Sequence, residues 1–293
     1  MKEKTLRKTA FYGFITPAFL LYGVFFLVPL VMSFVYSFAD YDGYTKFKFI
    51  GFGNYQAFLT DSEFFNTLKR TLIYTVCNVP FKVIIPLLLA ILATSKFLRG
   101  KAFVRSSFYI PVLLSALTVG MIINWMFGQE YGFVNFVIRQ FGGKAMEWAL
   151  NPVLATIVIS IASNWMSAGF YMVVFIGGIN EIPSEIYEAS EIDGANARQK
   201  FWKITLPMIR PTMLLVLLLS TNDLLKEYAL VQGVTQGGPG SDTTYIIQYI
   251  YDKAFHTTPA QYGYASAISV VAMVLFLIIA LIQYKATKGG EID

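Results

Sequence analysis

The segment from residue 185 to residue 207 reads EIYEASEIDGANARQKFWKITLP. It is polar, charged and amphipathic, whereas the chain on both sides of it is strongly apolar. A polar segment between two apolar runs predicts a short element that lies outside the apolar part of the fold.

This segment carries its own start and stop signals for helices. Ser184 precedes Glu185 and Glu188, which fall in the first turns, where the helix dipole favours anions. We expect Ser184 to cap this helix and Gly194 to end it. A second helical stretch is expected over residues 195–203.

The composition of the whole chain indicates a membrane protein. Hydrophobic residues make up 56% of the 293 residues and charged residues 14%, whereas a soluble domain carries about 25% charged residues. The single cysteine excludes an internal disulfide, and the single histidine excludes an ordinary histidine-rich metal site.

Six apolar runs are each long enough to cross a lipid bilayer. We predict an all-α membrane protein with one transmembrane domain over residues 1–293. The first run is too long for a signal-peptide core, so we interpret it as a retained span. The predicted spans cover residues 11–38, 71–94, 106–127, 152–178, 206–231 and 262–284.

Lysine and arginine give the predicted orientation. They are more frequent in the segments that lie on the side of the N-terminus, which favours a cytoplasmic N-terminus and a cytoplasmic C-terminus, N-in/C-in. This topology places the segment 184–207 in the cytoplasm. Outside the predicted spans no continuous basic face exists, so nucleic acid is not an expected partner.

The polar segment resembles the EAA loop of permease subunits in ATP-binding-cassette (ABC) importers. In that family the loop is a cytoplasmic coupling helix that docks on a separate ATPase. Ser190 departs from the family pattern, which more often has alanine there. The positions that carry the resemblance are Glu188, Ala189, Ser190, Gly194, Ile204, Leu206 and Pro207. An ordinary interfacial helix would not require this fixed set of positions.

Further segments are similar to carbohydrate-importer permeases of the maltose and glycerol-3-phosphate type. These segments are residues 14–29, 51–55, 105–111 and 235–239, with Thr243 and Thr244. The resemblance implies a type I ABC importer permease fold in a bacterial-type cell membrane, and a sugar or oligosaccharide cargo. It also implies a second permease subunit, an ABC ATPase dimer that holds the ATP and magnesium, and an extracytoplasmic solute-binding protein. No cofactor is expected on this chain itself.

Polar residues inside the predicted spans are candidates for the substrate path, because they are costly in a membrane. Amides and carboxylates bind sugar hydroxyls, and aromatic rings stack on sugar faces. Bonding between helices is an alternative role. We expect four of these residues, at positions 164, 165, 222 and 223, to face a shared cavity. The candidates are Asn164, Trp165, Tyr171, Asn222, Asp223 and Tyr228.

Lys82 lies near the centre of the second predicted span and needs a compensating partner there. By elimination, Asp223 or Glu227 is the expected partner. Asn124 and Trp125, late in the third span, are expected to pack between helices rather than to contact cargo.

No enzymatic site is predicted. The chain lacks the phosphate-binding pattern Gly-x-x-x-x-Gly-Lys-Ser/Thr and any catalytic cluster. Two other transport functions stay open. One is an ABC permease for a non-sugar solute, such as an amino acid or phosphate. The other is an ion-coupled secondary transporter, which would need intramembrane carboxylates and usually internal repeats.

Overall fold

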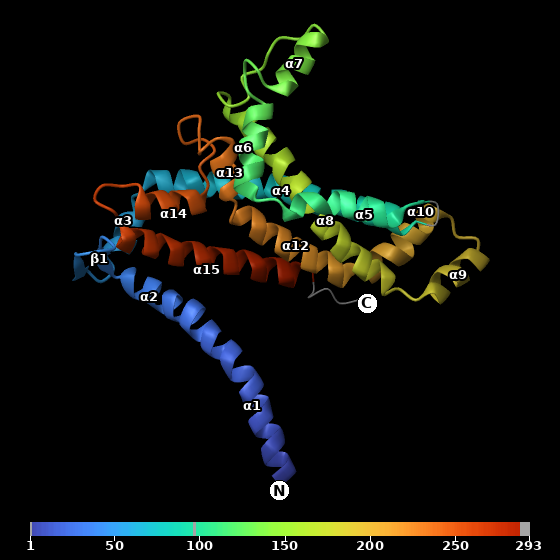
Figure 1. The fold of residues 1–293 in the computed structure, drawn as a ribbon, viewed down its shortest axis with the longest axis horizontal. Coiled ribbons are helices and arrows are strands. Elements are labelled where there is room, and N and C mark those ends of the chain that lie inside the picture. Colours follow the sequence, from blue (N-terminus) through green and yellow to red (C-terminus); the bar gives the residue numbers. More distant parts are fainter. Residues whose placement is uncertain (1, 96–97, 288–293) are drawn as a thin grey trace. The chain divides into compact units, whose positions relative to one another are not determined.

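The computed structural model of the protein describes residues 2–95 and 98–287, with side chains from residue 11 onward. Helices make up most of it, as the composition predicted (Figure 1). The described chain forms two compact units. One unit combines the segment up to Ser62 with Ile250–Val274, and the other combines Glu63–Tyr249 with the segment from Leu275 onward.

The first unit contains the N-terminal helix and a small β-hairpin. A π-helical turn, η1, interrupts the N-terminal helix. Its elements are α1 Lys2–Tyr22, η1 Gly23–Leu27, α2 Val28–Tyr36, β1 Ala39–Tyr41, β2 Phe47–Phe49 and α3 Gly53–Leu59, with most of α14 Ile246–Phe255 and the first part of α15 Tyr262–Ala286.

The second unit contains the helices that carry the predicted sites. Its elements are α4 Ser62–Thr94, α5 Lys101–Tyr109, η2 Ile110–Leu113, α6 Ala116–Met126, α7 Phe133–Gln140, α8 Pro152–Asn180, α9 Ser184–Ile192, α10 Ala197–Lys200, η3 Phe201–Thr205, α11 Leu206–Met208, α12 Arg210–Leu225 and α13 Ala229–Val234, followed by the last part of α15.

Four helical segments are long and apolar enough to cross a membrane. They are Phe11–Tyr36, Ser62–Thr94, Pro152–Asn180 and Tyr262–Ala286, and they coincide with four of the predicted spans. The other two predicted spans fall on bent helix pairs, with bends of 96° before Ala116 and 69° before Arg210. The number of spans is therefore four to six, and the count of exactly six stays a prediction.

The β-hairpin of the first unit was not part of the all-α prediction. β1 and β2 pair antiparallel, with Ala39 opposite Phe49. The Asp42 carboxylate accepts hydrogen bonds from the backbone N–H groups of Tyr44 and Lys46, and these bonds lower the pKa of Asp42 to about 2. The turn therefore keeps its charged carboxylate at neutral pH.

The core of the second unit is built around α8. Residues of α8 contribute to two clusters of buried side chains. One cluster joins α8 to α4, α12 and α13 and includes Tyr74, Ile159 and Leu224. The other joins α8 to α4 and the base of α12 and includes Tyr171 and Ile209. Because α8 is shared, the two clusters hold α4 and α12 against one helix.

α6 and α13 cross with their backbones in contact. A Cβ atom on Gly120 would lie 2.7 Å from the carbonyl oxygen of Leu230 and 2.8 Å from Cα of Gly233. Only glycine permits so close an approach. The Asn124 amide donates to the carbonyl of Val234 at 2.5 Å, so Asn124 connects these helices as predicted. Trp125 was expected to pack between helices too, but it is 71% exposed.

We predict that Gly120→Ala destabilises the fold by about 1–3 kcal/mol, because the added methyl group has no space. Thermal unfolding of the purified protein in detergent measures this. Gly177→Ala on α8 is the matched control, since no atom of the described residues lies within 4 Å of its Cβ position. Equal melting temperatures for the two variants would contradict the prediction.

Candidate functional site

The predicted coupling segment forms two short helices joined by a glycine turn. α9 and α10 lie at the same end of the second unit (Figure 1). Gly194 has a φ of 75°, and the Ala195 N–H donates to the carbonyl of Ser190 at 2.9 Å. This pattern is a Schellman turn, which needs a residue in the left-handed conformation. The prediction that Gly194 ends α9 is confirmed.

The prediction that Ser184 caps α9 is wrong. The helix begins at Ser184 itself, Pro183 occupies the cap position, and no side-chain capping bond forms there. Pro183 has an extended ψ of 136°, so the backbone turns from an extended to a helical conformation at Pro183 and not at Ser184. The capping box lies at α10, where Asn196 and Gln199 each accept a bond from the other's backbone N–H.

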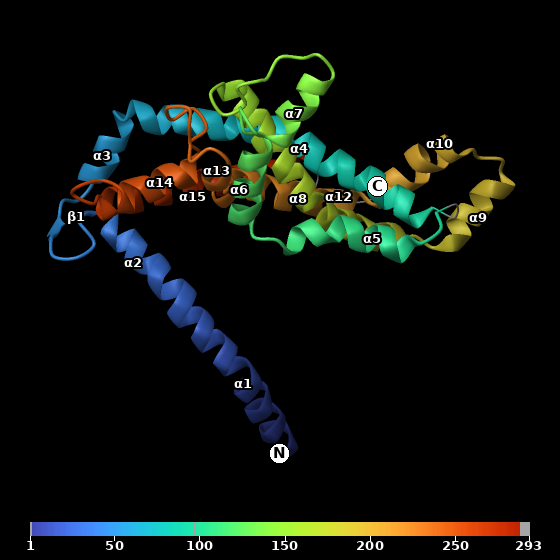
Figure 2. The ribbon, with the colours of Figure 1, turned by 45° about the horizontal axis from the view of Figure 1, so that its top comes forward.

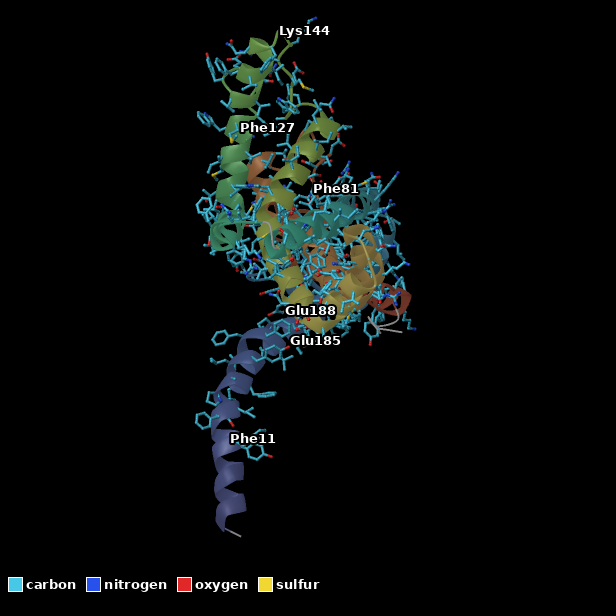
Figure 3. The ribbon with its side chains drawn as sticks, turned by 90° about the vertical axis from the view of Figure 1, so that its right-hand side faces the viewer. Phe11, Phe81, Phe127, Lys144, Glu185 and Glu188 are labelled. Carbon is cyan, nitrogen blue, oxygen red and sulfur yellow. The ribbon has the colours of Figure 1, made fainter. Side chains whose placement is uncertain are left out.

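One face of α9 is exposed and carries two carboxylates. Glu185, Glu188, Ala189 and Ile192 follow the spacing i, i+3, i+4, i+7, which places them on one side of the helix. Ile192 is 88% exposed. Figure 3 labels Glu185 and Glu188 on this helix. The face therefore presents an apolar side chain beside two negative charges.

The opposite face of α9 packs against the helix bundle. Ser190 is buried, and the Tyr187 hydroxyl lies 2.8 Å from Oγ1 of Thr205, in the π-helical turn η3. The side chains of Tyr187 and Phe201 pack on the buried cluster at the base of α8 and α12. α9 is thus attached to the bundle by one face, and its other face is exposed among the described residues.

The EAA-like positions divide between these two sides. Glu188, Ala189 and Gly194 are exposed. Ser190 is buried, and the three positions that return the chain to the bundle are half-buried, namely Ile204, Leu206 and Pro207. A contact with a partner is therefore available to the first group, while the second group fixes the segment. The role of these residues in coupling stays a prediction.

A second polar region lies where α12 ends and α13 begins. The helix stops at Leu225 and restarts at Ala229. A pocket of about 360 Å³ adjoins this break. Its polar lining residues are Lys82, Ser163, Ser167, Asp223, Lys226 and Glu227.

The charges of this pocket compensate one another. Lys82 is 4% exposed and interacts electrostatically with Glu227 and Asp223, the two partners expected by elimination. Ser163 donates to Oε2 of Glu227 at 2.8 Å, and the Tyr171 hydroxyl donates to Asp223. The ammonium group of α4, the Asp223 carboxylate of α12, the Glu227 carboxylate of the break after α12 and two hydroxyl groups of α8 therefore meet at one place.

The six predicted path residues do not all gather at this pocket in the described chain. Asp223 lines it and Tyr171 bonds to Asp223, but Asn164 and Trp165 line a separate apolar groove of about 860 Å³ between α4 and α8. The prediction that residues 164, 165, 222 and 223 face one shared cavity is therefore wrong.

The remaining predicted residues have other positions. Asn164 donates to Oδ1 of Asn78 at 3.0 Å, which is a bond between helices. Asn222 is exposed, and Tyr228 is half-buried within the break before α13. Which of the six residues contact cargo stays a prediction.

Sequence reasoning missed the hydroxyl groups of α8 that face the pocket. Ser163 and Ser167 are four residues apart, so they lie on one face of α8, and both line the pocket. These two serines continue a polar stripe that also contains Thr156, Ser160 and Asn164, and this stripe at helical spacing was the available signal.

The coupling segment and the loop between α7 and α8 lie far apart within the second unit. In Figure 3, Lys144, in the loop after α7, is at one end and Glu188 is toward the other. Figure 2 shows the same separation between α7 and the α9–α10 pair. The second unit therefore offers two distinct surfaces, and α12 leads from the coupling segment to the polar pocket.

Comparison with known proteins gives a consistent result. The family described as "Binding-protein-dependent transport system inner membrane component" matches residues 49–287. The multiple sugar-binding transport system permease protein MsmF of Streptococcus mutans is 31% identical over 99% of this chain and 99% of its own length. The arabinooligosaccharides transport system permease protein AraP of Bacillus subtilis is 31% identical over 95% of this chain and 88% of its own length.

The fold is also similar to that of a solved structure. A chain of a bacterial ABC transporter involved in the import of the acidic polysaccharide alginate superimposes with a TM-score of 0.84. The match covers 98% of this chain and 97% of that chain at 22% identity. At this identity the likeness concerns the fold alone.

We predict that Lys82→Met lowers stability by about 3 kcal/mol, because it leaves the carboxylates of Glu227 and Asp223 without a buried cation. The double variant Lys82→Met/Glu227→Gln removes one charge of each sign and should recover most of this loss. Thermal unfolding in detergent measures both. A double variant that is less stable than Lys82→Met would show that the two groups do not compensate each other.

Proposed function

We propose that this chain, which belongs to the family of binding-protein-dependent transport system inner membrane components, forms half of the path of an ATP-driven importer for a sugar or oligosaccharide. The sequence resemblance to ABC importer permeases is confirmed by the family match and by the relatives. The protein is a multi-pass membrane protein and a transport component rather than an enzyme. Its cargo and its partners belong to the proposal.

The outward face of α9 is the observation that carries the ATP-driven part of this proposal. It combines the exposed Ile192 with the carboxylates of Glu185 and Glu188. Such a surface fits a groove with an apolar floor and arginine or lysine side chains at its rim. We assign this groove to a separate ABC ATPase dimer, which would hold the ATP and magnesium. The permease chain then binds no cofactor of its own.

The cargo part of the proposal has two supports. The relatives named above are permeases for multiple sugars and for arabinooligosaccharides. The polar pocket beside the α12–α13 break offers hydroxyl, carboxylate and ammonium groups, which are the groups that bind sugar hydroxyls. We therefore place part of the sugar path at Asp223 and its neighbours.

The same proposal includes the topology of the chain, its partner subunits and the transport cycle. The chain would have six spans with both termini in the cytoplasm of a bacterial-type cell, and it would pair with a second permease subunit. An extracytoplasmic solute-binding protein would deliver the sugar on the side opposite α9. ATP binding would move α9, and the pocket would have different affinities for cargo in the inward-open and outward-open states.

We predict that Gly194→Val uncouples ATP hydrolysis from import. Valine is disfavoured at a φ of 75° by about 1–2 kcal/mol, which would disturb the Schellman turn and the angle of α9. The complex reconstituted in proteoliposomes gives the ratio of cargo imported to ATP hydrolysed.

Gly194→Asn is the matched control, because asparagine adopts the left-handed conformation more readily. It should retain coupling. No atom of residues 2–95 or 98–287 lies within 4 Å of the Cβ position of Gly194, so steric contact with this part of the chain does not separate the two variants. Normal coupling in Gly194→Val would refute this role.

We predict that Asp223→Ala weakens import more than Asn222→Ala does. A charge-assisted bond to a sugar hydroxyl is stronger than a neutral one, which is worth about 1 kcal/mol or roughly fivefold in affinity. Uptake of labelled neutral oligosaccharides, at matched membrane levels, measures this. Asp252→Asn in the first unit serves as the control.

The same vesicles test the cargo class directly. Labelled amino acids and phosphate are the competing classes. ATP-driven uptake of one of these, without uptake of any oligosaccharide, would overturn the sugar assignment.

A further inference from the structure

A side-chain hydrogen bond connects α9 to the base of α12. The Tyr187 hydroxyl lies 2.8 Å from Oγ1 of Thr205, and both residues are at least half-buried. A second contact, between Lys200 and Glu191 at 2.8 Å, joins α9 to α10, and its carboxylate side chain is 54% exposed. Exposed ion pairs contribute little, because water screens them. The bond between Tyr187 and Thr205 is therefore the more effective of the two connections.

Thr205 is held firmly to the start of α12. The Ile209 N–H donates to the carbonyl of Thr205 at 3.1 Å, and the Met213 N–H donates to the carbonyl of Ile209 at 2.8 Å. Ile209 is fully buried in the cluster that joins α8 and α12. The 69° bend at this point is thus fixed by hydrogen bonds and packing, and it is not a free hinge.

α12 then leads from this joint to the polar pocket. It has 16 residues, a length of about 24 Å at 1.5 Å per residue. Asp223 lies in its last turn, and Glu227 follows at the break. A displacement of Thr205 would therefore reach the charged cluster through one helix.

We propose that Tyr187 and Thr205 are positioning residues, whose hydrogen bond makes α12 follow the movement of α9. This inference rests on the proposed function and adds the internal route by which the ATPase acts on the cargo pocket. Without the bond, α9 can move while α12 keeps its place. The partner ATPase still hydrolyses ATP, but the pocket changes state less often.

The test uses the whole complex in nanodiscs, with the second permease and the ATPase. Cys77 is replaced by serine, and spin labels are attached at Leu215→Cys on α12 and Val153→Cys on α8, two exposed positions. The label separation is measured without nucleotide and after trapping with magnesium, ATP and vanadate.

The unsubstituted background should show two populations of label separation, shifted by trapping. Tyr187→Phe and Thr205→Val should each lower the ratio of the shifted to the unshifted population about fivefold, the effect of one neutral hydrogen bond. ATP hydrolysis by the complex should stay close to the background rate. Because both substitutions remove the same bond, their combination should have no further effect.

Three controls separate positioning from general damage. Thr205→Ser keeps the hydroxyl and should behave like the background. Tyr284→Phe and Thr287→Val remove the same groups at the end of α15 and should also leave the populations unchanged.

Two results would overturn the inference. One is an unchanged population ratio in an assembled Tyr187→Phe complex, and the other is additive effects in the double variant. The absence of any nucleotide-dependent shift in the unsubstituted complex would instead overturn the proposed function, and this inference with it.

Discussion

A buried ammonium group constrains how the second unit is assembled. Lys82 lies within the long apolar helix α4 and is almost completely buried. An unpaired cation in such surroundings costs several kcal/mol or more. The carboxylates of Glu227 and Asp223 must therefore lie beside α4, and Ser163 on α8 completes the cluster by donating to Glu227. One charge thus fixes the mutual placement of three helices.

The two ends of α12 belong to two different polar regions, the charged cluster around Lys82 and the coupling segment. The carboxylates at the end of α12 belong to the charged cluster, whereas the start of α12 is joined to the coupling segment through Thr205 and Ile209. Under the proposed function, the coupling of ATP hydrolysis to cargo movement would need a link between these two places. A single helix, α12, extends from one to the other.

The sequence alone was sufficient for features that depend on local chemistry. Four long spans were predictable because length and hydropathy are local properties. The turn at Gly194 was predictable because a helix end in the left-handed conformation favours glycine. The cap at Ser184 was not, because Pro183 competes for the same position.

The division of the path residues could not be read from the sequence. α8 carries its hydroxyl and amide side chains on one stripe about 100° wide, but the stripe does not indicate which neighbouring helix each side chain meets. Ser163 and Asn164 are adjacent and point about 100° apart. Ser163 therefore reaches Glu227, while Asn164 reaches Asn78 on α4. The predicted spans showed how far along the helix each residue lies. They did not show which direction each side chain faces, because the rotation of a helix about its axis depends on the helices packed against it.

The break in the fifth predicted span, between α12 and α13, lies beside the same charged cluster. Backbone groups that leave a helix inside a membrane must be bonded within the protein or line a polar cavity. Here the Lys226 N–H donates to the carbonyls of Asn222 and Asp223, the Glu227 N–H donates to that of Leu224, and the break adjoins the polar pocket. In a continuous helix, Asp223 and Glu227 would lie on one face, about 40° apart, because they are four residues apart. The break after Leu225 is therefore not needed to bring the two carboxylates together. Its N–H groups are bonded within the chain and it borders the polar pocket, so it meets the condition for an irregular backbone inside a membrane.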